Sequence, residues 1–171
     1  MKEENLKPSC LTYRILIALK CELKDTVGME QEIEAMKCQG LQLDIHVLTI
    51  VAGHFVSKGL KDKALVIVNE IERGNIKTII GGRTTLLCLY ASLGMADDAS
   101  RIWTVCKLDP TMNECLAAIA AWGKLGKVEE AKAVFEMMLE KWKKLPSNIY
   151  ADLLNVYVQN NMIFEGKKFL D

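Results

Sequence analysis

The chain has 171 residues, enough for one domain or a short array of smaller units, and half of them are hydrophobic, which excludes an intrinsically disordered chain. The 22 basic residues balance the 22 acidic ones. The sequence therefore lacks the strong positive charge of proteins that bind nucleic acid mainly through phosphates, and such binding would need a local patch or specific contacts.

From the N-terminus onward, apolar stripes at helical spacing predict a series of helices. The longest stripe runs through residues 128–142, with apolar side chains at i, i+3, i+4 and i+7. The other stripes, in chain order, are Tyr13, Leu16 and Ile17; Ala64, Ile67, Val68 and Ile71; Leu116, Ile119 and Trp122; and Tyr150, Leu153 and Leu154. The prolines fall between predicted pairs of helices, where each can end a helix: Pro8, Pro110 and Pro146.

These helices recur at one period, which indicates an internal repeat. Turn residues that tolerate a positive φ are spaced by 35, 32 and 35 residues: Gly59, Gly94, Gly126 and Asn161. Five residues after each lies a small side chain that lets paired helices approach closely: Ala64, Ala99, Ala131 and Gly166. Four residues further lies a bulky apolar side chain: Val68, Trp103, Phe135 and Leu170. Each period is therefore expected to form two antiparallel helices.

A single hairpin cannot bury its apolar face, so the hairpins are expected to stack into an all-α, right-handed solenoid forming one domain. The expected units are residues 10–44, 45–79, a short unit at 80–111, and 112–146. Residues 1–9 match the tail of a preceding repeat, and residues 147–171 form a partial one. We therefore expect an excerpt of a longer protein.

The six cysteines contain no Cys-x-x-Cys pair and no histidine at zinc-ligand spacing. We expect free, mostly buried thiols in a reducing compartment, with no metal and no cofactor. They are Cys10, Cys21, Cys38, Cys88, Cys106 and Cys115. No apolar run reaches the roughly 18 residues of a membrane span, and residues 1–9 are unlike a targeting segment, so none is expected in this chain.

The first full unit opens with Tyr13-Arg-Ile-Leu-Ile and closes at residues 34–44 with Glu-Ala-Met-Lys-Cys-Gln-Gly-Leu-Gln-Leu-Asp. These segments resemble the pentatricopeptide pattern of Tyr-Asn-x-Leu-Ile followed by Met-Lys-x-x-Gly-hydrophobic-x-Pro-Asp, and residues 121–131 resemble the family's middle segment. Tetratricopeptide repeats share the hairpin and the superfamily but lack this closing segment. The resemblance covers the whole chain and favours the plain type of plant organelles.

The resemblance implies binding of single-stranded RNA along a groove lined by the first helices, with about one base per repeat. In the family, the residue after the aromatic of the first helix and the last residue of the repeat read a base. By position these pairs are Arg14 with Asp44, Thr49 with Ile79, Thr84 with Thr111, and Leu116 with Pro146, with Ala151 as a half-pair. Lys124 matches the family's phosphate-facing basic residue, whereas the equivalent positions of the other repeats hold acidic or neutral residues: Glu22, Ser57 and Ser92.

Several candidate residues also have a structural interpretation. Arg14 could pair with Asp44 instead of reading a base, and a threonine near a helix start is about as often a cap. Trp103 and Trp142 are expected in the core, while Trp122 stays open between packing and base stacking. We expect His46 and His54 to be surface or satisfied histidines, and Lys141, Lys143 and Lys144 to form a solvated helix end.

No catalytic motif is present, so we do not expect an enzyme. One remaining hypothesis is a non-catalytic RNA-binding module of organellar RNA metabolism, mitochondrial or alternatively chloroplast. The other is a protein-interaction scaffold in a mitochondrial ribonucleoprotein or ribosome, favoured by the neutral charge and by base-reading pairs that offer few hydrogen bonds. We favour RNA binding because the family resemblance implies it. Neither a membrane nor a small-molecule substrate is expected as a partner.

Overall fold

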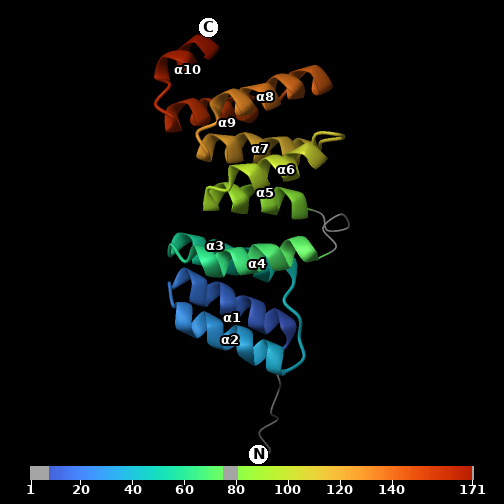
Figure 1. The fold of residues 1–171 in the computed structure, drawn as a ribbon, viewed down its shortest axis with the longest axis vertical. Helices are drawn as coiled ribbons and strands as arrows, with labels where there is room; N and C mark the ends of the chain where they lie inside the picture. The colour runs from blue at the N-terminus through green and yellow to red at the C-terminus, as the bar shows by residue number, and fades with distance from the viewer. Residues whose placement is uncertain (1–7, 75–80, 171) are drawn as a thin grey trace, which may run out of the picture. The chain divides into compact units, whose positions relative to one another are not determined.

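The computed structural model describes residues 8–74 and 81–170, and every regular element within them is an α-helix (Figure 1). The helices are α1 (Cys10–Glu22), α2 (Thr26–Cys38), α3 (Ile45–Ser57), α4 (Lys61–Arg73), α5 (Gly82–Leu93), α6 (Ala96–Cys106), α7 (Met112–Lys124), α8 (Val128–Trp142), α9 (Ser147–Gln159) and α10 (Ile163–Leu170). The chain divides into two compact units, residues 1–71 and 72–171. Most of the predicted tail at residues 1–9, and the candidate Ile79, lie outside the described residues.

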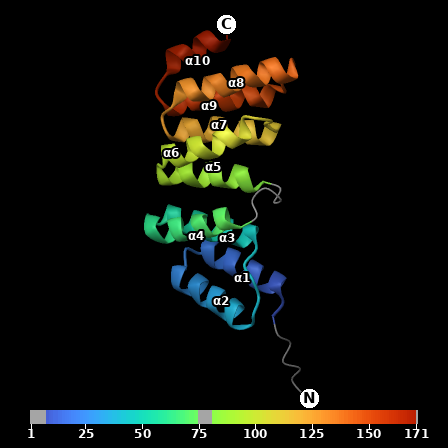
Figure 2. The same ribbon diagram turned by 45° about the vertical axis from the view of Figure 1, so that its right-hand side comes forward.

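Consecutive helices lie side by side as hairpins, as Figures 1 and 2 both show. Within the first unit, α1 packs against α2 and α3. Within the second unit, α5 packs against α7, α7 packs against α9, and each of these helices also contacts its own hairpin partner. The first helices of the hairpins therefore form one layer within each unit.

Every hairpin turn holds one residue in the left-handed conformation. The predicted column is confirmed, with φ of 71°, 78°, 71° and 59° at Gly59, Gly94, Gly126 and Asn161. The first hairpin uses Lys24, with φ of 58°, which the glycine pattern did not predict. In each turn two backbone N–H groups satisfy the last carbonyls of the first helix, as when Met95 N–H donates to Tyr90 O at 2.9 Å.

At Lys24, in the turn between α1 and α2, a lysine side chain bears the cost of the left-handed region. Replacing it by glycine is expected to raise the free energy of unfolding by about 0.5–1 kcal/mol, because the cost of Cβ exceeds the added chain entropy. Lys58→Gly is the matched control, since Lys58 is also exposed in a hairpin turn, between α3 and α4, but has φ of −89°. Urea denaturation checks both, and an equal response of the two variants would contradict the assignment.

The cores contain most residues of the predicted apolar stripes, such as Tyr13, Ile17 and Ile119, whereas Tyr150 is 37% exposed. The small column is confirmed, because Ala64, Ala99 and Ala131 have no exposed surface. Trp103 is buried as expected, whereas Trp142 is only half-buried because it lies at the last residue of α8. Trp122 is 2% exposed, so the structure favours packing over base stacking at this position.

The expectation of mostly buried thiols is wrong. All six cysteines are free, but only Cys106 and Cys115 are buried, and burial raises the pKa of each thiol to about 11. The exposed ones are Cys10, Cys38 and Cys88, which lie at the start of α1, at the end of α2 and within α5. Buried His54 is satisfied as expected, with its Nε2 atom 2.8 Å from the Thr26 hydroxyl.

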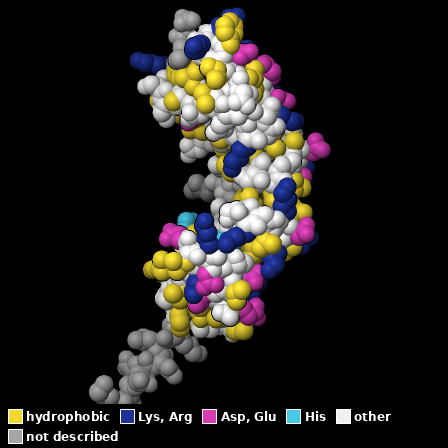
Figure 3. Space-filling model, turned by 90° about the vertical axis from the view of Figure 1, so that its left-hand side faces the viewer, with side chains coloured by type: hydrophobic (Ala, Val, Ile, Leu, Met, Phe, Trp, Pro, Cys, Tyr) yellow, Lys and Arg dark blue, Asp and Glu magenta, His cyan; other side chains and the backbone are white. Residues whose placement is uncertain are grey.

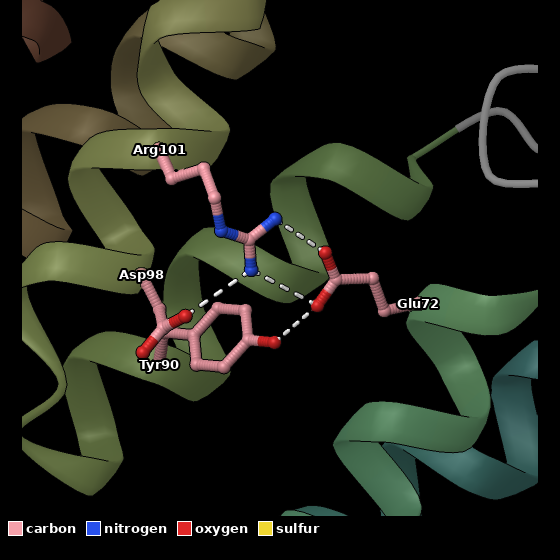
Figure 4. Close-up of polar contacts among 4 residues, drawn as sticks. All are labelled: Glu72, Tyr90, Asp98 and Arg101. Carbon is pink, nitrogen blue, oxygen red and sulfur yellow. Dashed lines mark hydrogen bonds and ion pairs between the residues drawn. The ribbon is translucent and has the colours of Figure 1, made fainter.

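A polar cluster within the second unit centres on Glu72 (Figure 4). The Arg101 guanidinium donates to both Glu72 carboxylate oxygens, at 2.5 and 3.1 Å, and also to Asp98 at 3.2 Å. The hydroxyl of Tyr90 donates to Glu72 as well. The Arg101 hydrogen bonds hold the pKa of Glu72 below its usual range, while burial and then the Glu72 carboxylate raise the pKa of Tyr90 to about 12. Every member of the cluster is thus occupied by another, and we assign it a structural role.

Candidate nucleic-acid interface

In the first unit, two candidate residues engage each other. Arg14 on α1 lies 3.6 Å from a carboxylate oxygen of Asp44, with 39% and 43% of the two side chains exposed. The other Asp44 oxygen accepts from the Val47 N–H at 2.9 Å and so caps α3. An exposed ion pair of this length contributes little energy, so a ligand group could replace Arg14. Both carboxylate oxygens of Asp44 thus already have a partner, Arg14 on one and the Val47 N–H on the other.

Thr49, the next candidate, is half-buried on α3 and is not a cap. Its hydroxyl donates to the Ile45 carbonyl at 2.6 Å, which uses its single hydrogen. The remaining lone pairs can accept a hydrogen bond, so Thr49 could read only a donor on a base edge. An open hollow on the same helix is lined by Glu22, Gly53 and His54 among others, and contains one carboxylate and no lysine or arginine.

In the second unit, the residue before Thr84 is connected to Thr111 through Glu114. Arg83, which precedes Thr84 on α5, forms an ion pair of 2.8 Å with buried Glu114 on α7. The other Glu114 oxygen accepts from both the N–H and the hydroxyl of Thr111, each at 2.9 Å. Thr111 is therefore the N-cap of α7 in a capping box. Its hydroxyl is already committed to holding that helix end.

Leu116 and Lys124 lie on α7 and line the same open pocket of about 290 Å³. The Lys124 ammonium donates to the neutral hydroxyl of Ser92 on α5 at 2.8 Å, and Lys124 forms no ion pair with a described residue. Apolar side chains of α7 and α9, including Ile119 and Val156, line the pocket as well. We name this hollow the α7–α9 pocket.

Three polar residues of α9 complete the α7–α9 pocket: Asp152, Asn155 and Gln159. None was a candidate from the sequence. A usable signal existed, because Asn155 and Gln159 lie four and eight residues after Ala151, as Lys124 lies eight after Leu116. A first helix repeats its face at these intervals, so side chains at these offsets project to the same side.

The remaining candidates lie apart from this pocket. Pro146 and Ala151 are exposed near the start of α9 and do not line it. In the basic cluster, Lys141 forms an ion pair of 3.0 Å with Asp109 and donates to Pro110 O at 2.8 Å. The structure thus places Leu116 with Lys124 and pairs Arg14 with Asp44, and it does not gather the other candidates into one site.

The charges around these positions are mixed. On the face that Figure 3 shows, acidic and basic side chains are interspersed and form no continuous basic patch. No helix within the described ranges is long and apolar enough to cross a membrane. In the same ranges, no three metal-ligating side chains gather. Binding of an anionic polymer would therefore depend on specific contacts, as the composition indicates.

Comparisons with known proteins agree with the repeat pattern. The model of the PPR repeat family matches residues 116–142. Two mitochondrial pentatricopeptide repeat-containing proteins of Arabidopsis thaliana are 44% and 42% identical over 167 residues, which is 98% of this chain. The chain spans 28% of the length of each of these relatives.

Among solved structures, the chain is similar to the pentatricopeptide repeat protein PPR10 in complex with an 18-nt psaJ RNA element. The TM-score is 0.73 at 21% identity, over 96% of this chain and 25% of that one. PPR10 from maize gives a TM-score of 0.68, also at 21% identity, over 95% of this chain and 24% of that one. This likeness shows the predicted fold, a solenoid of stacked helical hairpins. With its repeat columns, its match to the repeat model and its two Arabidopsis relatives, the chain belongs to the pentatricopeptide repeat family.

Proposed function

We propose that the chain is a non-catalytic module that binds single-stranded RNA along the first helices of its hairpins. Its role is in organellar RNA metabolism: transcript processing, stabilisation or translation. The mitochondrial relatives favour the mitochondrion, with the chloroplast as the alternative. The repeats run over residues 10–44, 45–79, 80–111 and 112–146, with a partial repeat after them.

One observation of the geometry carries the proposal. Open hollows lie on the first-helix layer of each unit, and in the second unit the hollow contains the Lys124 ammonium, which forms no ion pair with a described residue, beside apolar side chains. A cation beside an apolar surface suits the phosphate and the base of one nucleotide. PPR10, which has the same fold, is bound to an RNA element in its structure.

A matched pair of variants tests the proposal. Thr49→Val with Thr84→Val removes two candidate hydroxyls and keeps their shape, and should weaken binding to pooled single-stranded RNA or change its base preference. Base contacts in such grooves contribute about 1–3 kcal/mol each. Thr104→Val is the control, because the Thr104 hydroxyl donates to Ser100 O just as that of Thr49 does to Ile45 O, but on a second helix.

Filter binding at two salt concentrations measures these affinities, and few neutralised phosphates predict a shallow salt dependence. Melting temperatures should stay close to that of the unchanged chain. No affinity for any single-stranded RNA pool at low salt would contradict RNA binding.

In that case the second candidate function, a protein-interaction scaffold in a mitochondrial ribonucleoprotein or ribosome, takes its place. Specific observations favour this alternative: Arg14 is already paired, and Leu116 and Pro146 offer no polar side-chain group to a base.

A further inference from the structure

The α7–α9 pocket has the composition of a site for one planar polar group. Its volume of about 290 Å³ is at the small end of the range for ligand sites, about 300–1,000 Å³. Leu116 and Val156 are among the apolar side chains that can contact a flat aromatic face, and Asp152, Asn155 and Gln159 can reach its polar edge.

These polar side chains are available to a ligand. Asn155 and Gln159 are exposed, and neither makes a side-chain hydrogen bond within residues 8–74 and 81–170. Asp152 is half-buried and forms no ion pair with a described residue, Lys124 in the same pocket included. Polar side chains that line one hollow and are not engaged by the protein can exchange their water for a ligand, and a few such groups orient the ligand in a pocket.

We infer that the α7–α9 pocket binds one amino-bearing base of the RNA strand (adenine, cytosine or guanine, but not uracil) through Asn155 and Asp152, with Lys124 contacting the adjoining phosphate. The inference rests on the proposed function and deepens it. It moves base recognition in this part of the chain away from Leu116 with Pro146, the positions that the family pattern indicates, and onto α9.

The choice of base follows from hydrogen-bond chemistry. The Asn155 amide has a donor and an acceptor side by side, and can pair with a base edge that presents both. The Asp152 carboxylate only accepts, so it favours the exocyclic amino groups of adenine, cytosine and guanine over the edge of uracil, where two carbonyl oxygens flank a single N3–H. The negative Asp152 carboxylate repels a neighbouring phosphate, and the positive charge of Lys124 offsets this repulsion.

Binding of oligo(A), oligo(C) and oligo(U) of equal length, followed by fluorescence anisotropy at low salt, tests the inference on the whole chain. The unchanged chain should prefer oligo(A) or oligo(C) over oligo(U) by about tenfold. Asn155→Leu should weaken binding of the preferred oligomer by about tenfold, whereas Asn69→Leu, at an exposed site on α4, should not. Asp152→Asn should raise the affinity for oligo(U) relative to oligo(C), and Asp97→Asn, the same charge change on α6, should leave the preference intact.

The outcomes separate the two proposals. If the unchanged chain binds RNA but Asn155→Leu and Asp152→Asn keep its affinity and base preference, the pocket inference is wrong and RNA binding stands. If the unchanged chain binds none of the three oligomers, both proposals are wrong. Melting curves of the variants serve as the folding check, since both side chains lie at the surface of α9 and neither is part of the core.

Discussion

Replacement of Phe135 by alanine is expected to lower the free energy of unfolding by about 3–5 kcal/mol, the range for deleting a buried phenylalanine. The Phe135 ring is 2% exposed and joins three helices. It meets Tyr150 of α9 edge-on, with the ring centroids 5.2 Å apart, and Phe169 of α10 at 5.3 Å. Such aromatic pairs add about 0.5–1.5 kcal/mol to the burial itself, so the loss should lie towards the upper end of the range.

Phe164→Ala provides the matched control. Phe164 lies on α10 with 77% of its surface exposed, so the same substitution should change stability by less than about 0.5 kcal/mol. Guanidinium denaturation followed by circular dichroism measures both variants. Equal midpoints for the two would mean that Phe135 does not join α8 to α9 and α10.

Substitution of Ala131 by leucine should destabilise the chain by about 1–3 kcal/mol through overpacking. Ala131 has no exposed surface, and its helix, α8, packs against both α7 and α9. A leucine there needs space that close-packed interiors do not contain, so side chains must leave their preferred rotamers or the helices must separate.

Ala133→Leu is the control, because Ala133 is exposed on the same helix and accepts the same side chain without crowding. Its unfolding midpoint should stay within about 0.5 kcal/mol of that of the unchanged chain. An Ala131→Leu variant as stable as Ala133→Leu would show that the small column does not mark close helix contacts.

The fold could be predicted from the sequence because its determinants are local and repeated. A turn that needs positive φ favours glycine, so three glycines and Asn161 revealed the period. The glycine pattern did not reveal the turn at Lys24, because this turn has the same backbone geometry but contains neither glycine nor asparagine at that position. The hydrogen bonds that close the turn, such as Asp25 N–H to Lys20 O, hold the unfavourable residue there, and they are made by backbone groups that a propensity pattern cannot show.

The candidate site was less predictable because it depends on which polar groups are already occupied. Thr111 and Thr49 have the same side chain, yet Thr111 caps α7 together with Glu114, whereas the Thr49 hydroxyl donates within α3. The family pattern directed attention to two positions per repeat, whereas Asp152 and Asn155 became candidates only when the structure placed them in one hollow with Lys124. Side chains of separate helices meet there, and spacing along one helix does not reveal that.

The hairpin turns have a consequence for how the chain folds. Their closing hydrogen bonds join residues only three and five positions apart, for example Gly126 N–H to Gly123 O and Lys127 N–H to Trp122 O. Contacts between residues close in the chain form quickly, because little entropy is lost in closing a short loop. Each hairpin can therefore nucleate by itself and recruit its neighbours in either direction, so assembly has no single obligatory starting point.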